Sequence, residues 1–322
     1  MSGGMAPLRR ARYLLEYAIV RGLAALVAPL PRPLVWKLGG RLGRLACRLL
    51  PSRRRLAHAN VARAFPQLSP QQVAAVVSRS FENFARTALD ILWSMSRGPD
   101  QIARWVRIGP DVLAATQAVA AGGRGGILAL AHFGNWEIVG LAWGWLVPAP
   151  VSVIAKPLHN PCLDRWLNHY RRRSGNRVIP TGGSAREVLM HLREGRLVAM
   201  VMDQRTPERY GGVAADFFGH PAMTTKAPAS FALSLGVPIV VLACVADEAG
   251  CYHVRAAGPL SFQPSGDRQR DVLSLTQTLN RLLEEEIRRA PEYYFWMHDR
   301  WGMKDSPPAS PPPPGPRPPS VP

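Results

Sequence analysis

Residues 127–137, ILALAHFGNWE, join a short apolar run to a polar segment that begins at His132. The glycine-rich segment 122–126 precedes the run, and apolar residues after such a break predict a buried strand over 127–131. His132 then stands at the carboxyl end of this strand, and Glu137 follows about one turn into the helix that we expect next. In open parallel sheets, sites form beyond the carboxyl ends of strands. His132 and Glu137 are therefore our first candidates for catalytic residues.

This pair of side chains has the chemistry of a general base and its partner. A histidine titrates near neutral pH, and a nearby carboxylate can hold its ring and stabilise the imidazolium. Such a base can remove the proton from a hydroxyl that attacks an acyl carbon. GxSxG, GxxxxGK and HExxH motifs are all absent, so the sequence supports neither a serine hydrolase nor a P-loop enzyme. A structural role for both residues is the alternative.

Short apolar runs alternate with helical patterns along most of the remaining chain. The runs that predict further strands cover residues 151–155, 177–179, 197–202 and 238–245. The helical patterns cover residues 70–93, which a capping box at Ser69 and Gln72 begins, 162–173, 184–194, 224–235 and 267–289. Continuously apolar strands between helices are typical of a parallel sheet covered on both faces. We therefore expect an α/β fold with a mostly parallel central sheet flanked by helices.

The composition indicates an anionic partner. The 322 residues carry 40 Lys and Arg against 22 Asp and Glu, a net charge of +18, and their 47% hydrophobic content excludes a disordered chain. Residues 1–55 hold twelve of the basic residues and a single acid, Glu16, which places +11 of this charge there. The same stretch is rich in Leu, Ala and Val, unlike a nucleic-acid-binding arm, and we recognise no nucleic-acid module. We expect a membrane surface and no nucleic acid, and keep a basic nucleic-acid-binding protein as a remote alternative.

Residues 34–50, LVWKLGGRLGRLACRLL, are typical of an interfacial helix on an anionic bilayer. Four basic residues follow a spacing of four, three and four: Lys37, Arg41, Arg44 and Arg48. Four leucines repeat this spacing one residue later: Leu38, Leu42, Leu45 and Leu49. Residues 13–31 are also apolar, but Glu16 and Arg21 interrupt them below the ~20 residues that span a bilayer. The alternative is an amphipathic helix packed on the protein's own core.

Several sequence blocks resemble one enzyme family. AHFGNWE, with His132 and Glu137, resembles the HxxxxD/E motif of glycerolipid and glycolipid acyltransferases, in particular the bacterial lipid A late acyltransferases (lauroyl and myristoyl transferases). Further blocks resemble this family in the same order: Asn60–Pro66 (NVARAFP), Lys156–Pro161 (KPLHNP), Arg171–Gly175, Met202–Gln204 (MDQ), Phe217–Gly219 (FFG) with Thr224 and Thr225, and Pro291–His298 (PEYYFWMH). The resemblance covers most of the chain.

The resemblance implies an enzyme at the cytoplasmic face of the inner membrane. It would move a fatty acyl chain from an acyl-thioester, acyl carrier protein or acyl-CoA, to a hydroxyl of a lipid A-type glycolipid precursor. No metal, cofactor or covalent acyl-enzyme is implied, and the thioester donor is a co-substrate. His132 would be the general base and Glu137 its orienting partner. Another glycolipid, such as a phosphatidylinositol mannoside, or a lysophospholipid is the alternative acceptor.

Four further residues are implied in substrate binding: Arg171, Asp203, Lys156 and Asn160. An arginine fork suits a substrate phosphate or a developing oxyanion, and Asp203 at a strand end could orient that arginine or sugar hydroxyls. The alternatives are a solvated face that Arg171 shares with Arg172 and Arg173, and a turn cap at Asp203. Lys156 stands where the family has arginine.

The chain divides by composition into three parts. We expect a membrane-anchoring helical segment over 1–50, an acyltransferase domain over 51–305 and a disordered proline-rich tail over 306–322. The four scattered cysteines form no CxxC pair, so we expect neither a disulfide framework nor a zinc ribbon. We expect the protein to work in a reducing compartment. Chain length of the acyl group, oligomeric state and whether 13–31 inserts into the membrane or lies on it stay open.

Overall fold

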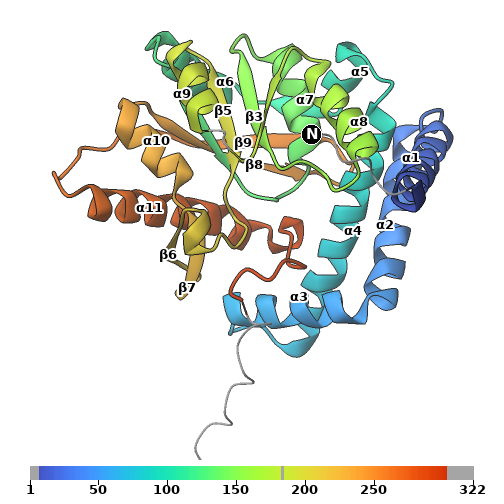
Figure 1. Ribbon diagram of the computed structural model, residues 1–322. Coiled ribbons are helices and arrows are strands. Elements are labelled where there is room, and N and C mark those ends of the chain that lie inside the picture. Colours follow the sequence, from blue (N-terminus) through green and yellow to red (C-terminus); the bar gives the residue numbers. More distant parts are fainter. Residues whose placement is uncertain (1–6, 183–184, 303–322) are drawn as a thin grey trace, which may run out of the picture.

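A seven-stranded sheet forms the centre of the protein (Figure 1). The computed structural model describes residues 7–182 and 185–302, so the predicted tail at 306–322 lies outside the described residues. The strands lie in the order β1-β9-β8-β2-β5-β3-β4, and β8 pairs antiparallel with β9 while the other pairs are parallel. Their bounds are β1 Val106–Ile108, β2 Gly126–Leu130, β3 Val151–Ala155, β4 Arg177–Pro180, β5 Leu197–Val201, β8 Ile239–Ala246 and β9 Tyr252–Leu260. The predicted mostly parallel α/β sheet is confirmed.

Helices cover both faces of this sheet. One buried cluster packs α9, α10 and α11 on β2, β5 and β8, and a second packs α6 and α7 on the opposite faces of the same strands. The helix bounds are α1 Pro7–Val27, α2 Arg32–Leu49, α3 Pro51–Ala64, α4 Pro70–Ser94, α5 Pro99–Ala103, α6 Pro110–Ala121, α7 Trp136–Leu146, α8 Pro161–Arg172, α9 Ala185–Arg193, α10 Ala227–Leu235 and α11 Arg268–Arg289, with 3-10 turns at Glu208–Tyr210 and Pro291–Tyr293.

The predicted strands match the structure to within about a residue at each end, but four strands were not expected. β1 has three residues, and β9 alternates buried and exposed positions before its Gly258-Pro259 pair, so neither forms a continuous apolar run. The antiparallel hairpin of β6 (Gly212–Phe217) and β7 (His220–Thr225) lies outside the main sheet. Such patterns carry a weak signal beside the continuous runs of buried parallel strands.

Helix α2 packs closely on α4, and its contact face is made of glycine. Gly39 and Gly43 are buried, and a Cβ at Gly43 would lie 2.4 Å from the Glu82 Cα. At Gly39 a Cβ would lie 2.8 Å from the Arg86 Cα. Because Gly39 and Gly43 have no side chain, the backbone of α2 approaches α4 closely along this face. Residues 32–49 are thus packed into the same structure as the rest of the chain, across the predicted boundary at residue 50.

The leucine stripe of α2 points away from this contact. Leu42, Leu45 and Leu49 are 49%, 48% and 67% exposed, whereas Gly39, Gly43 and Cys47 face the interior. Helix α1 carries a second exposed apolar row: Leu8, Leu15, Ile19, Leu23 and Leu26. An amphipathic helix packed only on its own core would bury its leucines. Among the described residues, no helix combines the length and the apolar character needed to cross a membrane.

We expect alanine at Gly43 to destabilise the protein. The new methyl group must push α2 from α4, which costs about 1–3 kcal/mol of unfolding free energy, as overpacking does. Gly22 in α1 is the matched control, because a Cβ there meets nothing within 4 Å. Gly22→Ala should be neutral or stabilising by up to about 1 kcal/mol. Urea unfolding measures the unfolding free energy of both variants. Equal changes would contradict the close packing of α2 on α4 at Gly43.

Candidate active site

His132 and Asp203 meet at the carboxyl edge of the sheet. His132 follows β2 and Asp203 follows β5, its parallel neighbour, so both side chains leave the sheet at the same edge. The Asp203 Oδ1 lies 2.8 Å from the His132 Nδ1 and accepts a hydrogen bond from the His132 backbone N–H at 3.1 Å. One buried carboxylate oxygen therefore fixes both the backbone and the ring of His132, and favours the tautomer with the proton on Nδ1. The Nε2 is the ring nitrogen that Asp203 does not engage.

The pair alters the titration of both groups. Burial alone would lower the pKa of His132, but the charge and hydrogen bond of Asp203, with a further contribution from Glu137, raise it above its ordinary value. Burial alone would raise the pKa of Asp203, but His132 and the nearby Arg300 hold it low. The carboxylate therefore stays charged while the imidazole titrates.

Glu137 makes a different contact from the one we expected. Its carboxylate lies in the first turn of α7 and accepts two hydrogen bonds from Arg171 in the last turn of α8, at 3.0 Å from Nε and 2.5 Å from Nη2. The His132 ring donates its hydrogen bond to Asp203 instead. Because β5 lies beside β2, Asp203 reaches the ring directly, whereas Glu137 acts on the imidazole through its charge. The part of Glu137 in catalysis stays a prediction.

The turn Phe133-Gly134-Asn135, which lies between His132 and Glu137, is held by hydrogen bonds from two sides. Phe133 and Tyr294 form an isolated bridge, and the Gly134 N–H donates to the Tyr293 carbonyl at 3.0 Å. On the other side the Thr87 hydroxyl of α4 donates to the Gly134 carbonyl at 3.1 Å. Gly134 has a φ of +62°, and a Cβ there would lie 1.7 Å from the Cys244 carbonyl oxygen. The segment therefore requires glycine at this position.

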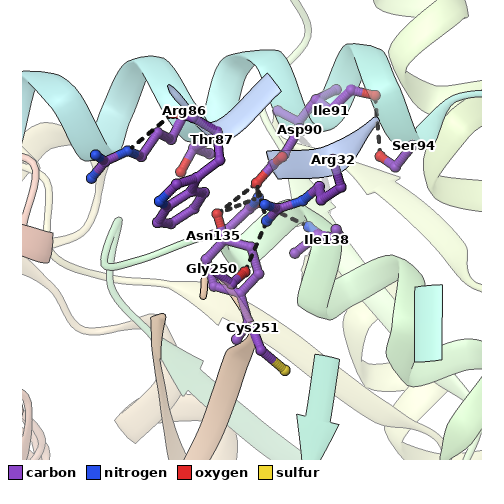
Figure 2. Close-up of polar contacts among 12 residues, drawn as sticks. Arg32, Arg86, Thr87, Asp90, Ile91, Ser94, Asn135, Ile138, Gly250 and Cys251 are labelled. Carbon is purple, nitrogen blue, oxygen red and sulfur yellow. Dashed lines mark hydrogen bonds and ion pairs between the residues drawn. The ribbon is translucent and has the colours of Figure 1, made fainter. Parts of the chain in front are cut away.

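Asn135, at the end of this turn, caps α7 and enters a buried network (Figure 2). Its Oδ1 accepts from the Ile138 N–H at 3.0 Å, and its Nδ2 donates to Asp90 at 3.4 Å. The same Asp90 oxygen accepts from Tyr252 at 2.7 Å and from Arg32 of α2 at 3.0 Å. The network thus ties α2, α4 and β9 to the first turn of α7, where Glu137 lies.

Arg32 is fully enclosed in this network. Its side chain is 1% exposed, and its other hydrogen bond goes to the Gly250 carbonyl at 3.0 Å. Four aromatic rings surround its guanidinium at 4.9 to 6.0 Å: Trp36, Trp93, Trp105 and Tyr252. Two of its nitrogens have no hydrogen-bond acceptor among the residues that the structure describes, so the ring faces and the Asp90 charge compensate for the lost water.

Comparison with family models assigns the chain to a family. The model of the bacterial lipid A biosynthesis acyltransferases matches residues 3–303, nearly the whole chain. The chain belongs to this family. It is therefore an acyltransferase, as the resemblance implied.

Curated relatives of the acyltransferase fall into two groups. The lipid A biosynthesis lauroyltransferase of Escherichia coli is 27% identical over 281 residues, 87% of this chain and 89% of the relative. The lipid A biosynthesis palmitoleoyltransferase of the same organism is 25% identical over 287 residues, with the same coverage. The phosphatidylinositol mannoside acyltransferase of Mycobacterium tuberculosis is 29% identical over 189 residues, 57% of each chain.

The structure places the remaining predicted residues of the acyltransferase in unlike surroundings. Lys156 follows β3 and is exposed at the same edge of the sheet as His132 and Asp203. Asn160 is buried, and its Oδ1 caps α8 through the Cys162 N–H at 2.9 Å. Its Nδ2 donates to the Tyr13 carbonyl and to Glu16, both at 2.9 Å, so Asn160 anchors α1. The polar atoms of Asn160, which we predicted for the acceptor pocket, are thus engaged inside the protein.

Two residues near the His132 and Asp203 pair were not predicted from the sequence. Arg300 is 1% exposed, donates to the Met223 carbonyl at 3.0 Å and to Thr224 at 2.6 Å, and its charge acts on Asp203. The His298 Nε2 accepts from the Arg205 N–H at 3.0 Å, and burial lowers the pKa of His298. His298 ends the PEYYFWMH block, so its place in a block that resembles the family could have indicated it from the sequence.

One group of the described residues could hold a metal ion. The ligand atoms of Asp247, Cys251 and His253 lie within 4.8 Å of one another at the turn between β8 and β9. Asp247 already accepts from the Cys251 N–H at 2.9 Å and contacts the His253 Nε2 at 2.9 Å. These internal contacts account for the arrangement. Our expectation of a reaction without a metal stays a prediction.

We expect Asp90→Asn to destabilise the acyltransferase strongly. The amide keeps the shape of the carboxylate but leaves the buried Arg32 charge uncompensated, which costs about 3–5 kcal/mol of unfolding free energy. Glu285→Gln on the exposed face of α11 removes the same charge and should change stability by less than about 0.5 kcal/mol. Urea unfolding compares the two. A loss at Asp90 as small as that at Glu285 would show that the aromatic rings alone stabilise Arg32.

Proposed function

We propose that this acyltransferase moves a fatty acyl chain from an acyl-thioester to a hydroxyl group of a glycolipid, with His132 as the general base. The observation that carries the proposal is the hydrogen bond of the His132 Nδ1 with Asp203, which leaves Nε2 free for a substrate hydroxyl. The two groups of relatives are named for lipid A biosynthesis and for a phosphatidylinositol mannoside, and both names denote glycolipids.

The proposed reaction needs one base and no covalent intermediate on the protein. The His132 Nε2 takes the proton of the acceptor hydroxyl while its oxygen attacks the thioester carbonyl carbon. The resulting imidazolium is stabilised by the Asp203 charge at 2.8 Å. When the tetrahedral intermediate collapses, the C–S bond breaks and the imidazolium returns the proton to the thiolate. The products are the ester and the free thiol, and His132 is neutral again.

We propose a lipid A-type precursor as the acceptor and a fatty acyl thioester of acyl carrier protein as the donor. Matches to the lipid A relatives extend over 87% of the chain, against 57% for the phosphatidylinositol mannoside relative. This difference favours lipid A. A phosphatidylinositol mannoside is the second candidate for the acceptor, because Lys156 in the KPLHNP block stands where the family has arginine. Acyl-CoA is the second candidate for the donor.

We also propose that α1 and α2 bring the enzyme to the cytoplasmic face of the inner membrane. Both helices expose leucines, and Lys37, Arg41, Arg44 and Arg48 are exposed next to the leucine stripe of α2. A basic residue near an anionic surface contributes about 1 kcal/mol, and leucines add apolar burial at the headgroup boundary. A glycolipid acceptor would be reached from that position.

The test of the function is acyl transfer by the purified enzyme across a matrix of donors and acceptors, followed by mass spectrometry. We expect His132→Ala to lower the rate by about 10²–10⁴-fold without unfolding the protein. His253→Ala is the matched control, because His253 also contacts a carboxylate, Asp247, but is exposed. Near wild-type turnover by folded His132→Ala enzyme would contradict the mechanism.

The pH profile of the reaction tests the role of Asp203. A general base must be neutral, so kcat/KM should rise with pH through the raised pKa of His132, above the ordinary value of 6.5. Asp203→Asn removes the charge that stabilises the imidazolium, so the rising limb should move to lower pH and the maximal rate should fall. An unchanged limb in the Asn variant would assign Asp203 a different role.

Vesicle flotation tests the membrane proposal. Leu15→Ser with Leu45→Ser removes one exposed leucine from each helix and should lower binding to anionic vesicles several-fold, because apolar burial is lost. Met190→Ser with Leu273→Ser is the matched control on α9 and α11, where both side chains are exposed. If the two double variants float equally well, membrane contact lies elsewhere on the protein.

A further inference from the structure

The three arginines at the end of α8 have three different surroundings. Arg171 is held by Glu137 through two hydrogen bonds. Arg173 donates to the carbonyls of Ser94, Met95 and Arg97, at and just beyond the carboxyl end of α4. Arg172 is exposed and has no carboxylate partner among the described residues. Of the three, Arg172 is therefore the one whose charge is available to a ligand.

Arg172 lines a cavity of about 540 Å³ between α8 and the ends of β3 and β4. His169 and Arg165, about one and two turns earlier on α8, line the same cavity, and both are exposed. Ala155 and Val178 form part of its apolar lining. The cavity therefore joins an apolar lining to side chains that can donate charge-assisted hydrogen bonds, which are short and strong toward phosphate oxygens.

The acid of the cavity does not neutralise these arginines. Asp164 also lines the cavity, but its Oδ1 accepts from the Leu158 N–H at 2.8 Å and its Oδ2 accepts from Asn168 at 3.0 Å. The Arg165 guanidinium contacts the Cys162 sulfur at 3.7 Å, a weak acceptor. Arg165 and Arg172 thus give the cavity a positive charge, and an anion is the ligand that this charge favours.

The cavity adjoins the candidate active site through hydrogen bonds. Asn168 lines the cavity and accepts from the Arg171 Nη1 at 3.1 Å, and Arg171 holds Glu137. Ala155 ends β3, whose neighbour β5 leads to Asp203. A ligand in the cavity would lie at the same edge of the sheet as His132. It would therefore lie where a remote part of a substrate can be held during the reaction.

We propose that this cavity binds a phosphate group of one of the two substrates, with Arg165 and Arg172 as its ligands. The proposal rests on the proposed function and names residues other than Arg171, which Glu137 already engages. The shared chemistry is a phosphate ester, which can come from a phosphorylated glycolipid acceptor or from the phosphopantetheine arm of the thioester donor.

The test replaces the two arginines together, Arg165→Gln with Arg172→Gln. We expect the KM of one substrate to rise at least about tenfold, as the loss of charge-assisted hydrogen bonds does. Arg186→Gln with Arg193→Gln is the matched control, since these exposed arginines lie on α9 at the same spacing of seven residues. The control should keep the wild-type KM for both substrates.

Two substrate pairs identify the source of the phosphate. If the acceptor supplies it, the wild-type preference for a phosphorylated acceptor over its dephosphorylated analogue disappears in the Arg165→Gln, Arg172→Gln enzyme. If the donor supplies it, the KM defect occurs with acyl-CoA or acyl carrier protein and is absent with an acyl-pantetheine donor that lacks phosphate.

Calorimetric titration with inorganic pyrophosphate tests the cavity without turnover. The wild-type and control proteins should bind pyrophosphate at least about tenfold more tightly than the Arg165→Gln, Arg172→Gln variant. No difference among the three proteins in either pyrophosphate binding or KM would overturn the proposal, and so would a loss of pyrophosphate binding with unchanged KM values. Wild-type enzyme that transfers no acyl chain with any pair of substrates would contradict the proposed function instead, because the calorimetry is read independently.

Discussion

The buried ion pair of Arg32 and Asp90 joins parts of the protein that the sheet alone does not connect. Arg32 comes from α2, Asp90 from α4, Tyr252 from β9, and Asn135 from the turn that begins α7. Removing either charge leaves the other unpaired in a buried site, which is strongly destabilising. The packing of these four elements therefore depends on the ion pair. The turn after β2 depends on this constraint, because Asp90 and Thr87 hold it from the same face of α4.

Two carboxylates at the site then have separate tasks. Asp203 binds the His132 ring and its backbone, and Glu137 binds Arg171 and so joins the start of α7 to the end of α8. A negative charge at a helix start and a positive charge at a helix end both suit the helix dipoles. The same contacts set the charge around the imidazole, since both carboxylates raise the pKa of His132.

The sequence predicts the strands of this fold better than their order. Buried parallel strands such as Leu197–Val201 are apolar throughout, and that pattern is visible without a structure. It does not tell which strands are neighbours, so the contact of His132 with Asp203, 71 residues away, was not predictable although both residues were candidates. The contact of Glu137 with Arg171 depends in the same way on α7 lying beside α8. The sequence did signal the close packing of α2, because Gly39 and Gly43 share a helix face that is separate from the exposed leucines.

The amino-terminal helices contact residues that lie far away along the chain, and this affects folding during synthesis. Arg32 bonds a carbonyl 218 residues later, and Asn60 of α3 bonds the Trp296 carbonyl 236 residues later. Domains fold as units while the chain emerges from the ribosome, and contacts of high sequence separation form late. Helix α2 packs on α4, which follows it closely in the chain, but the contacts of α2 and α3 with the carboxyl-terminal part of the protein form last. Until the turn before β9 and the segment around Trp296 emerge, Arg32 lacks its Gly250 acceptor and Asn60 lacks the Trp296 carbonyl. The nascent amino-terminal helices therefore leave polar groups incompletely bonded that are buried in the finished protein.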